Sequence, residues 1–184
     1  RKGIFGKRKF KLNYVGTDIP ISEIFMFTNA AVWNKIYELD FLISHNIKFA
    51  DTVYAEDAAF MYKTLCSASS IYLFDELLYS YSSPDTNPNS NDKKSCSTWQ
   101  DLFKSMDEVW DYIKESDIQD KVQIKESFIC SMIGHIRYAQ TKMRTPNERS
   151  DVTIFGFEWL SRKQHELEKE IKTLNAVKKI RKIF

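Results

Sequence analysis

The chain has 184 residues, of which 43% are hydrophobic and 28% are charged, a composition typical of one globular domain and not of a disordered or fibrous protein. Only five residues are glycine, and their spacing excludes both a dinucleotide fingerprint and a P-loop. The net charge is +2, but both ends are basic and the segment between them is acidic. Basic ends suit a phosphate-rich or membrane-surface partner, or are simply solvated.

The cysteine count and hydropathy restrict the cellular setting. The three cysteines form no C-x-x-C pair, and an odd number argues against a disulfide framework, so a reducing cytosol is expected. The longest stretch without a charged residue, Ile24–Asn34, is far shorter than the ~20 residues needed to cross a bilayer. Because the first residue is Arg and not Met, we expect a fragment of a longer protein.

The first half of the chain predicts short strands alternating with short helices. Apolar and aromatic residues favour a buried strand at Ala30–Lys35, followed by one or two helical turns at Leu39–His45. Helical spacing of apolar residues predicts a helix over Glu56–Ala68. Residues 71–74 and 77–82 are then predicted to form two short strands.

The second half predicts three helices. Ser82–Ser97, rich in turn-forming residues, is a loop. The first helix starts at a capping box of Ser97 and Gln100, the second spans about Gln119–Met143, and the third starts at the capping box of Thr145 and Glu148. The apolar positions that we expect to face the core are Trp99, Leu102, Phe103, Met106, Val109, Trp110 and Ile113; Val122, Ile129, Met132, Ile133 and Ile136; and Trp159, Leu160, Leu167, Ile171 and Leu174.

Candidate chemical groups taken singly have ordinary structural explanations. His45, His135 and His165 share no metal-ligand spacing, and His135 lies in an apolar stretch typical of a hydrogen-bonded core histidine. Glu56 and Asp57 open a predicted helix, where acidic side chains cap free N–H groups and complement the macrodipole. These residues alone therefore predict a mixed domain with a helical second half, without an activity.

Several short motifs follow one another in a fixed order: Trp33-Asn34-Lys35-Ile36-Tyr37, Phe41-Leu42, His45-Asn46-Ile47-Lys48-Phe49, Glu56-Asp57 with Phe60, Ile71-Tyr72, and Asp75-Glu76-Leu77-Leu78-Tyr79-Ser80-Tyr81. In this order and spacing, residues 28–82 resemble the second half of bacterial glycosyltransferase family 2 domains. Those domains have the GT-A fold and act in the synthesis of surface glycans.

The resemblance implies roles for five residues. Asp57 matches the acid that is the usual catalytic base, and Glu56 would orient it or bind acceptor hydroxyls. An inverting transferase needs such a base to remove the proton of the attacking acceptor hydroxyl. Trp33, Lys35 and Tyr81 would lie on the acceptor side, so Asp57 is expected to face a sugar-sized hollow.

Two departures from the family pattern limit this expectation. The chain contains no Asp-x-Asp and no nucleotide-binding unit before Trp33, so the Mg²⁺ or Mn²⁺ ion on the donor diphosphate would be held elsewhere in the parent enzyme. Ser82, Ser83 and Asp85 stand where many relatives carry basic residues. We therefore expect the acceptor-side half of a transferase, inactive by itself.

Together these features predict an α+β, mainly α protein: a partial GT-A domain with a few short strands at residues 1–96 and a helical extension of about three helices at 97–184. The predicted function is inverting transfer of a sugar from a nucleotide-diphosphate donor to a saccharide or lipid-linked acceptor. The alternative is a non-catalytic helical module for oligomerisation or docking. A cytoplasmic location is expected, with the basic Lys178–Lys182 segment either on the inner membrane face or in solvent; no nucleic-acid partner is expected.

Overall fold

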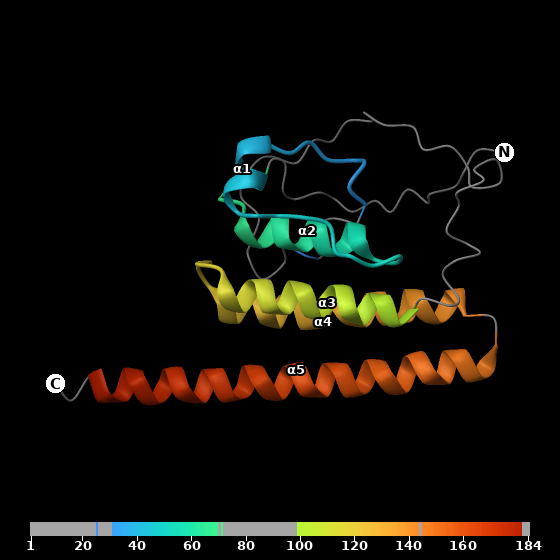
Figure 1. The fold of residues 1–184 in the computed structure, drawn as a ribbon. Helices are drawn as coiled ribbons and strands as arrows, with labels where there is room; N and C mark the ends of the chain where they lie inside the picture. The colour runs from blue at the N-terminus through green and yellow to red at the C-terminus, as the bar shows by residue number, and fades with distance from the viewer. Residues whose placement is uncertain (1–24, 26–30, 70, 72–98, 144, 182–184) are drawn as a thin grey trace, which may run out of the picture.

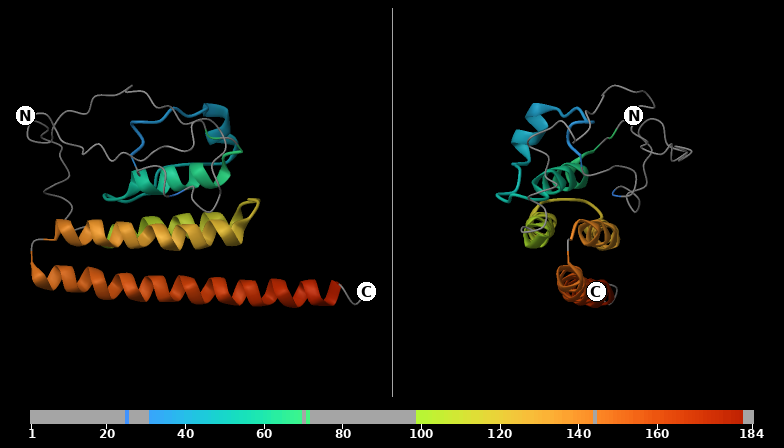
Figure 2. Two further views of the ribbon diagram at one scale, coloured as in Figure 1. Left: turned by 180° about the vertical axis from the view of Figure 1, so that it is seen from behind. Right: turned by 90° about the vertical axis from the view of Figure 1, so that its right-hand side faces the viewer.

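The computed structural model describes residues 25, 31–69, 71, 99–143 and 145–181. These contain five helices, α1 (Leu39–Ser44), α2 (Glu56–Ser67), α3 (Trp99–Glu115), α4 (Lys121–Lys142) and α5 (Pro146–Arg181). Helices α3 and α4 lie side by side and antiparallel, with α1 and α2 on one side of them and α5 on the other (Figures 1 and 2). The described residues therefore form a stack of three helical layers.

The predicted α+β class with GT-A strands is wrong, because the described residues contain no strand. The expected strand at Ala30–Lys35 is instead a turn from residue 31 onward. The ammonium of Lys35 donates to the carbonyl of Ala31 at 2.5 Å, which closes the segment on itself. Aromatic and β-branched residues favour strands only where neighbouring strands supply cross-strand contacts. The strands expected at 71–74 and 77–82 lie outside the described residues except for Ile71, which is irregular.

The predicted helices are confirmed within the described residues, with small shifts of their ends. At the start of α5, the backbone N–H of Thr145 donates to the Glu148 carboxylate at 2.9 Å, and the Glu148 N–H donates to the Thr145 hydroxyl at 3.2 Å. This is the expected capping box, with Pro146 as the first helical residue. The cap predicted at Ser97 lies outside the described residues.

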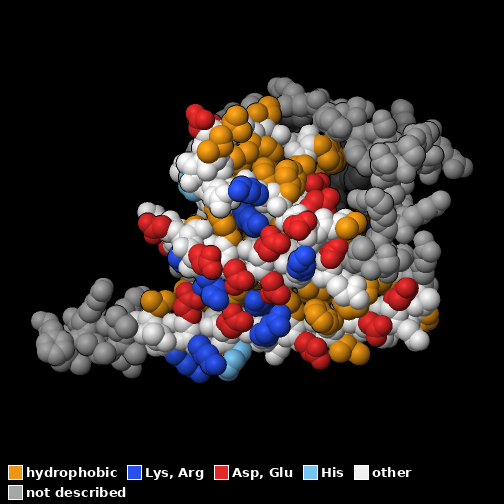
Figure 3. All heavy atoms as spheres, in the orientation of Figure 1, with side chains coloured by type: hydrophobic (Ala, Val, Ile, Leu, Met, Phe, Trp, Pro, Cys, Tyr) orange, Lys and Arg blue, Asp and Glu red, His pale blue; other side chains and the backbone are white. Residues whose placement is uncertain are grey.

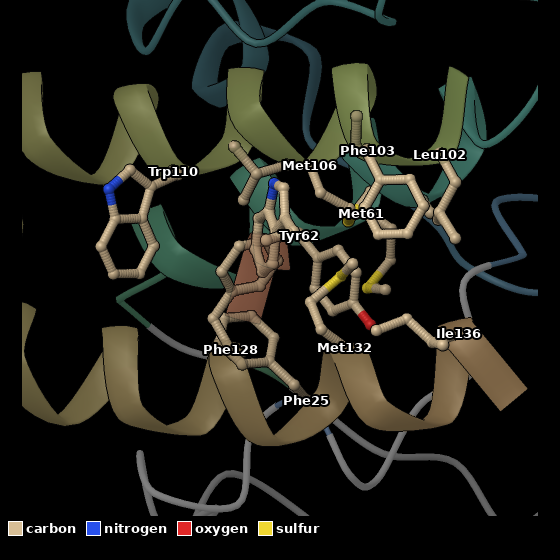
Figure 4. Close-up of a cluster of buried hydrophobic side chains, with 14 of the residues drawn as sticks. Phe25, Met61, Tyr62, Leu102, Phe103, Met106, Trp110, Phe128, Met132 and Ile136 are labelled. Carbon is tan, nitrogen blue, oxygen red and sulfur yellow. The ribbon is translucent and has the colours of Figure 1, made fainter. Parts of the chain in front are cut away.

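The core lies between α2, α3 and α4 and continues down to α5. Tyr62 of α2 meets Phe128 of α4 edge to face, with ring centroids 5.3 Å apart. Figure 4 shows Met61 and Tyr62 among side chains from α3 and α4. The predicted stripe of α3 is buried, with Trp99 partly so. This apolar burial is the main stabilising contribution to the bundle.

Charged side chains are also buried between α3, α4 and α5. Lys125 and Lys163 are 2% and 5% exposed, and their ammonium groups lie 5.5 and 5.2 Å from the Trp110 ring centre. Lys125 pairs with Glu170, and Lys163 lies 2.8 Å from Asp107. Because each buried cation has a carboxylate partner, the network fixes how α5 sits against the other helices.

Two predicted core positions are wrong. Ile133 is 45% exposed and Leu174 is 43% exposed. Ile133 lies on α4 between the core residues Met132 and Ile136, but its side chain is not part of the buried cluster. Leu174 lies on α5 three residues after Ile171, the last described α5 side chain that packs against the core. None of the helices in the described residues combines the length and apolar composition that crossing a membrane requires.

Candidate functional site

The segment before α2 is anchored to α3 by hydrogen bonds. The backbone N–H of Val53 donates to the Asp101 carboxylate at 2.9 Å, and the hydroxyls of Thr52 and Ser105 are 2.7 Å apart. The Ser105 hydroxyl also donates to the carbonyl of Tyr54 at 3.3 Å. These bonds hold the first turn of α2 in a fixed position over the start of α3.

Helix α2 begins with an unusual backbone conformation. Its N-cap residue, Ala55, is left-handed with φ of 67° and ψ of 15°, and no side chain caps the helix. This conformation costs an alanine about 1 kcal/mol or more. The acidic residues of the first turn are Glu56 and Asp57, as predicted. Strained backbone of this kind is often found at functional sites.

Asp57 lies close enough to Lys35 for each to affect the other's protonation. Partial burial raises the pKa of the Asp57 carboxyl, and the Lys35 ammonium partly offsets that rise. Burial lowers the pKa of Lys35 to about 8, and the attraction of Asp57 acts in the opposite direction. The turn at residues 31–37 thus brings a cation to the carboxylate at the start of α2, and both predicted site residues belong to one cluster.

Tyr37 is a third member of this cluster, and it was not among the predicted site residues. Burial and the nearby charge of Asp57 raise its pKa to about 12. Its ring packs edge-on against Phe60, with centroids 5.3 Å apart, one turn after Asp57 on α2. Its buried hydroxyl has no hydrogen-bond partner within the described part of the chain. Buried hydroxyls normally have a partner, so this one is suited to receive a bound polar group.

Glu56 lies in a different electrostatic setting from Asp57. Its pKa is raised by burial first, with a backbone hydrogen bond acting against this, and by the negative charges of Asp57 and Asp101. The charge of Asp101 on α3 therefore acts on the pKa of Glu56 in addition to that of the adjacent Asp57. Among the described residues no cluster of three His, Cys, Asp or Glu side chains could hold a metal ion.

The other predicted residues are less informative. Trp33 lies in the turn and is 39% exposed, and Tyr81 lies outside the described residues. Two shallow hollows are found: one on α5 lined by Phe157 to His165, and one beside α1 lined by residues between Leu39 and Lys48. Neither is lined by Asp57, so neither is the sugar-sized hollow that we expected around this residue.

The predictions for the histidines can be compared directly. The ring of His135 is mostly buried, and its Nε2 hydrogen-bonds to the Tyr62 hydroxyl. Burial lowers its pKa to about 4, so it is a neutral core histidine, as predicted. His45 ends α1, where its Nδ1 lies 3.0 Å from the carbonyl of Phe41.

Hydrophobic side chains gather on the surface over α1 and the segment after it (Figure 3). Ile36 is 91% exposed, and Leu39, Ile43 and Phe49 are all more than half exposed. Phe49 stacks on Phe60 with centroids 4.4 Å apart, so this surface reaches the residue that supports Tyr37. An apolar surface therefore borders the Lys35, Tyr37 and Asp57 cluster.

No protein-family model matches the chain, and neither a curated protein nor a solved structure is similar to it. The resemblance to family 2 glycosyltransferases therefore remains a prediction from the pattern of residues 28–82.

Proposed function

We propose that this chain forms the acceptor-side part of an inverting glycosyltransferase, with Asp57 as the general base. The parent enzyme would transfer a sugar from a nucleotide-diphosphate donor to a saccharide or lipid-linked acceptor. The donor nucleotide and its divalent metal would be bound by a part of the enzyme that this chain does not supply. With free thiols at Cys66 and Cys130, the proposed location is the cytoplasm, at the inner face of the membrane.

The observation that carries the proposal is the cluster of Asp57, Lys35 and Tyr37. A carboxylate that served only to cap α2 would need no partner from a turn 20 residues earlier in the chain. Here it lies partly buried beside an ammonium and a buried hydroxyl that has no hydrogen-bond partner among the residues that the structure describes. Perturbed titratable groups gathered in this way are characteristic of catalytic sites.

The chemistry assigned to these residues is one proton transfer coupled to one displacement. The acceptor oxygen attacks the anomeric carbon as its proton passes to the Asp57 carboxylate. The bond from the anomeric carbon to the donor diphosphate breaks, and its electron pair leaves with the nucleotide diphosphate. Lys35 would keep the partly buried Asp57 ionised, and Tyr37 would hydrogen-bond the acceptor. A raised pKa makes Asp57 a better base than an exposed carboxylate.

The test is sugar transfer by the full gene product carrying Asp57→Asn, with Asp51→Asn as the matched control on an exposed residue nearby. Loss of the base should lower kcat at least about 100-fold, while Asp51→Asn should leave it unchanged. Activity of the wild type should fall as the pH drops below the raised pKa of Asp57, since a protonated carboxyl accepts no proton. Equal activity of the two variants would remove Asp57 from the mechanism.

The second candidate is a non-catalytic docking module. It is favoured by the position of the two hollows, neither of which is lined by Asp57. In that case Glu56 and Asp57 only complement the dipole of α2. Asp57→Asn would then change the stability of the helix slightly and would have no effect on sugar transfer. The two candidates thus differ in the outcome of the same experiment.

A further inference from the structure

The end of α5 projects beyond the rest of the helical stack. The ion pair of Lys125 with Glu170 joins α5 to the second turn of α4, and Ile171 is the last of the described α5 side chains that packs against the core. Helix α5 continues to Arg181, ten residues further, which corresponds to about 15 Å. Figures 1 and 2 show this end of α5 extending past both α3 and α4.

The projecting end is cationic and apolar. Lys169 and Lys172 are exposed, and Leu174 is 43% exposed. After Glu170 the sequence contains no acidic residue. The basic residues that follow are Lys172, Lys178, Lys179, Arg181 and Lys182, and the large apolar ones after Ile171 are Leu174, Val177, Ile180, Ile183 and Phe184.

We infer that the end of α5, from Lys169 onward, binds an anionic lipid surface. The positive charge complements acidic headgroups, and the exposed Leu174 supplies an apolar side chain for the boundary of the acyl chains, as in interfacial amphipathic helices. The same end of a second copy would bring like charges together and is therefore a poorer partner.

This contact is compatible with the proposed site. Helix α5 lies on the opposite side of the α3–α4 layer from α2, which carries Asp57. A lipid surface along the end of α5 would leave the first turn of α2 uncovered. Lipid binding therefore requires neither Asp57 nor transferase activity, and Asp57→Asn should bind vesicles as the wild type does.

The experiment is co-sedimentation of the full 184-residue chain with vesicles of phosphatidylcholine alone or mixed equally with phosphatidylglycerol. Binding is expected only to the mixed vesicles and should weaken with added salt. The double variant Lys169→Gln, Lys172→Gln should reduce partitioning about 25-fold, about fivefold for each lysine. Leu174→Ser should reduce it as well. The matched control is Lys104→Gln, Lys114→Gln on exposed positions of α3, which should bind unchanged.

Thermal unfolding of each variant shows whether it is folded. Three results would overturn the inference: no binding to the mixed vesicles, equal binding to both kinds of vesicle, or equal loss in the α3 control. Light scattering measures the oligomeric state of the chain in solution and tests the remaining alternative. A dimer in solution that the Lys169 and Lys172 substitutions dissociate, without vesicle binding, would assign the end of α5 to a second copy instead.

Discussion

Residues 31–71 and residues 99–181 differ in how their side chains are used. The first region has two short helices, largely irregular connections and large exposed apolar side chains such as Ile36. It holds Asn46 and Ala55 in left-handed conformations, and the second region holds Asp120 in one at the start of α4. The second region is three longer helices, whose inward-facing side chains form most of the core. Candidate chemistry thus lies in the less regular region, where side chains are not fully committed to packing.

The charges of the two regions differ in the same way. In the helical region the buried cations Lys125 and Lys163 each have a carboxylate close by. Around Asp57, by contrast, burial shifts the pKa values of Lys35 and Tyr37, and the Tyr37 hydroxyl has no hydrogen-bond partner among the described residues. Complete pairing of buried charges favours stability, whereas a hydroxyl such as that of Tyr37 is left able to bind a ligand.

Replacing one tryptophan in each region should give the largest contrast in stability. Trp110 is 1% exposed, and its indole N–H donates to Glu166 at 2.8 Å, so Trp110→Ala should lower the free energy of unfolding by about 3–5 kcal/mol. Trp33 is 39% exposed, so Trp33→Ala should cost less than about 1 kcal/mol. Urea unfolding measures both. Similar losses would show that the first region is packed as firmly as the bundle.

Two aspartates of α3 test whether buried pairing stabilises the helical region. Asp107 accepts from the Trp159 indole at 3.0 Å and from Lys163 at 2.8 Å. Asp107→Ala leaves Lys163 buried without its nearest carboxylate, at a cost of about 3 kcal/mol. Asp111 forms an exposed pair with Lys114 at 3.7 Å, so Asp111→Ala should change stability by less than about 0.5 kcal/mol. A small effect at both positions would contradict the role given to the buried network.

Two helical glycines test the packing of α4 against α5 on a smaller scale. A Cβ at Gly156 would lie 2.9 Å from Cδ1 of Ile136, whereas a Cβ at Gly134 would meet nothing within 4 Å. Gly156→Ala should therefore lower the free energy of unfolding by about 1 kcal/mol in total. Gly134→Ala should raise it by up to about 1 kcal/mol, because alanine has the higher helix propensity. The midpoint of urea unfolding reports both changes. A gain at Gly156 would show that α5 packs less closely than described.

The sequence predicted the helical region better than the first region, for a physical reason. Apolar residues such as Leu102, Met106 and Val109 repeat at the period of a helix. Their spacing therefore predicts both the helix and its buried face, whichever neighbouring element covers that face. The turn at Ala31–Lys35 has strand-like composition, but a strand also needs a partner, which sequence composition does not report. Exposure of Ile133 and Leu174 likewise depends on where the neighbouring helices end.

The site could be predicted only in part. Asp57 and Lys35 were found from the motif order, and the structure brings them together. Tyr37 belongs to the same motif, two residues after Lys35, but nothing in the sequence indicates that its hydroxyl is buried with no partner in the described part of the chain. Such a feature depends on the packing of Tyr37 against Phe60, which is a tertiary contact.

Titration of the Asp57 carboxyl carbon by NMR tests the central claim most directly. Because burial disfavours the ionised form, the pKa should lie above the ordinary value of 3.8. Lys35→Met should raise it further, since the ammonium that favours the carboxylate is removed. A pKa at or below 3.8 that Lys35→Met leaves unchanged would mean that Asp57 is an exposed helix cap, without the cluster on which the proposed function depends.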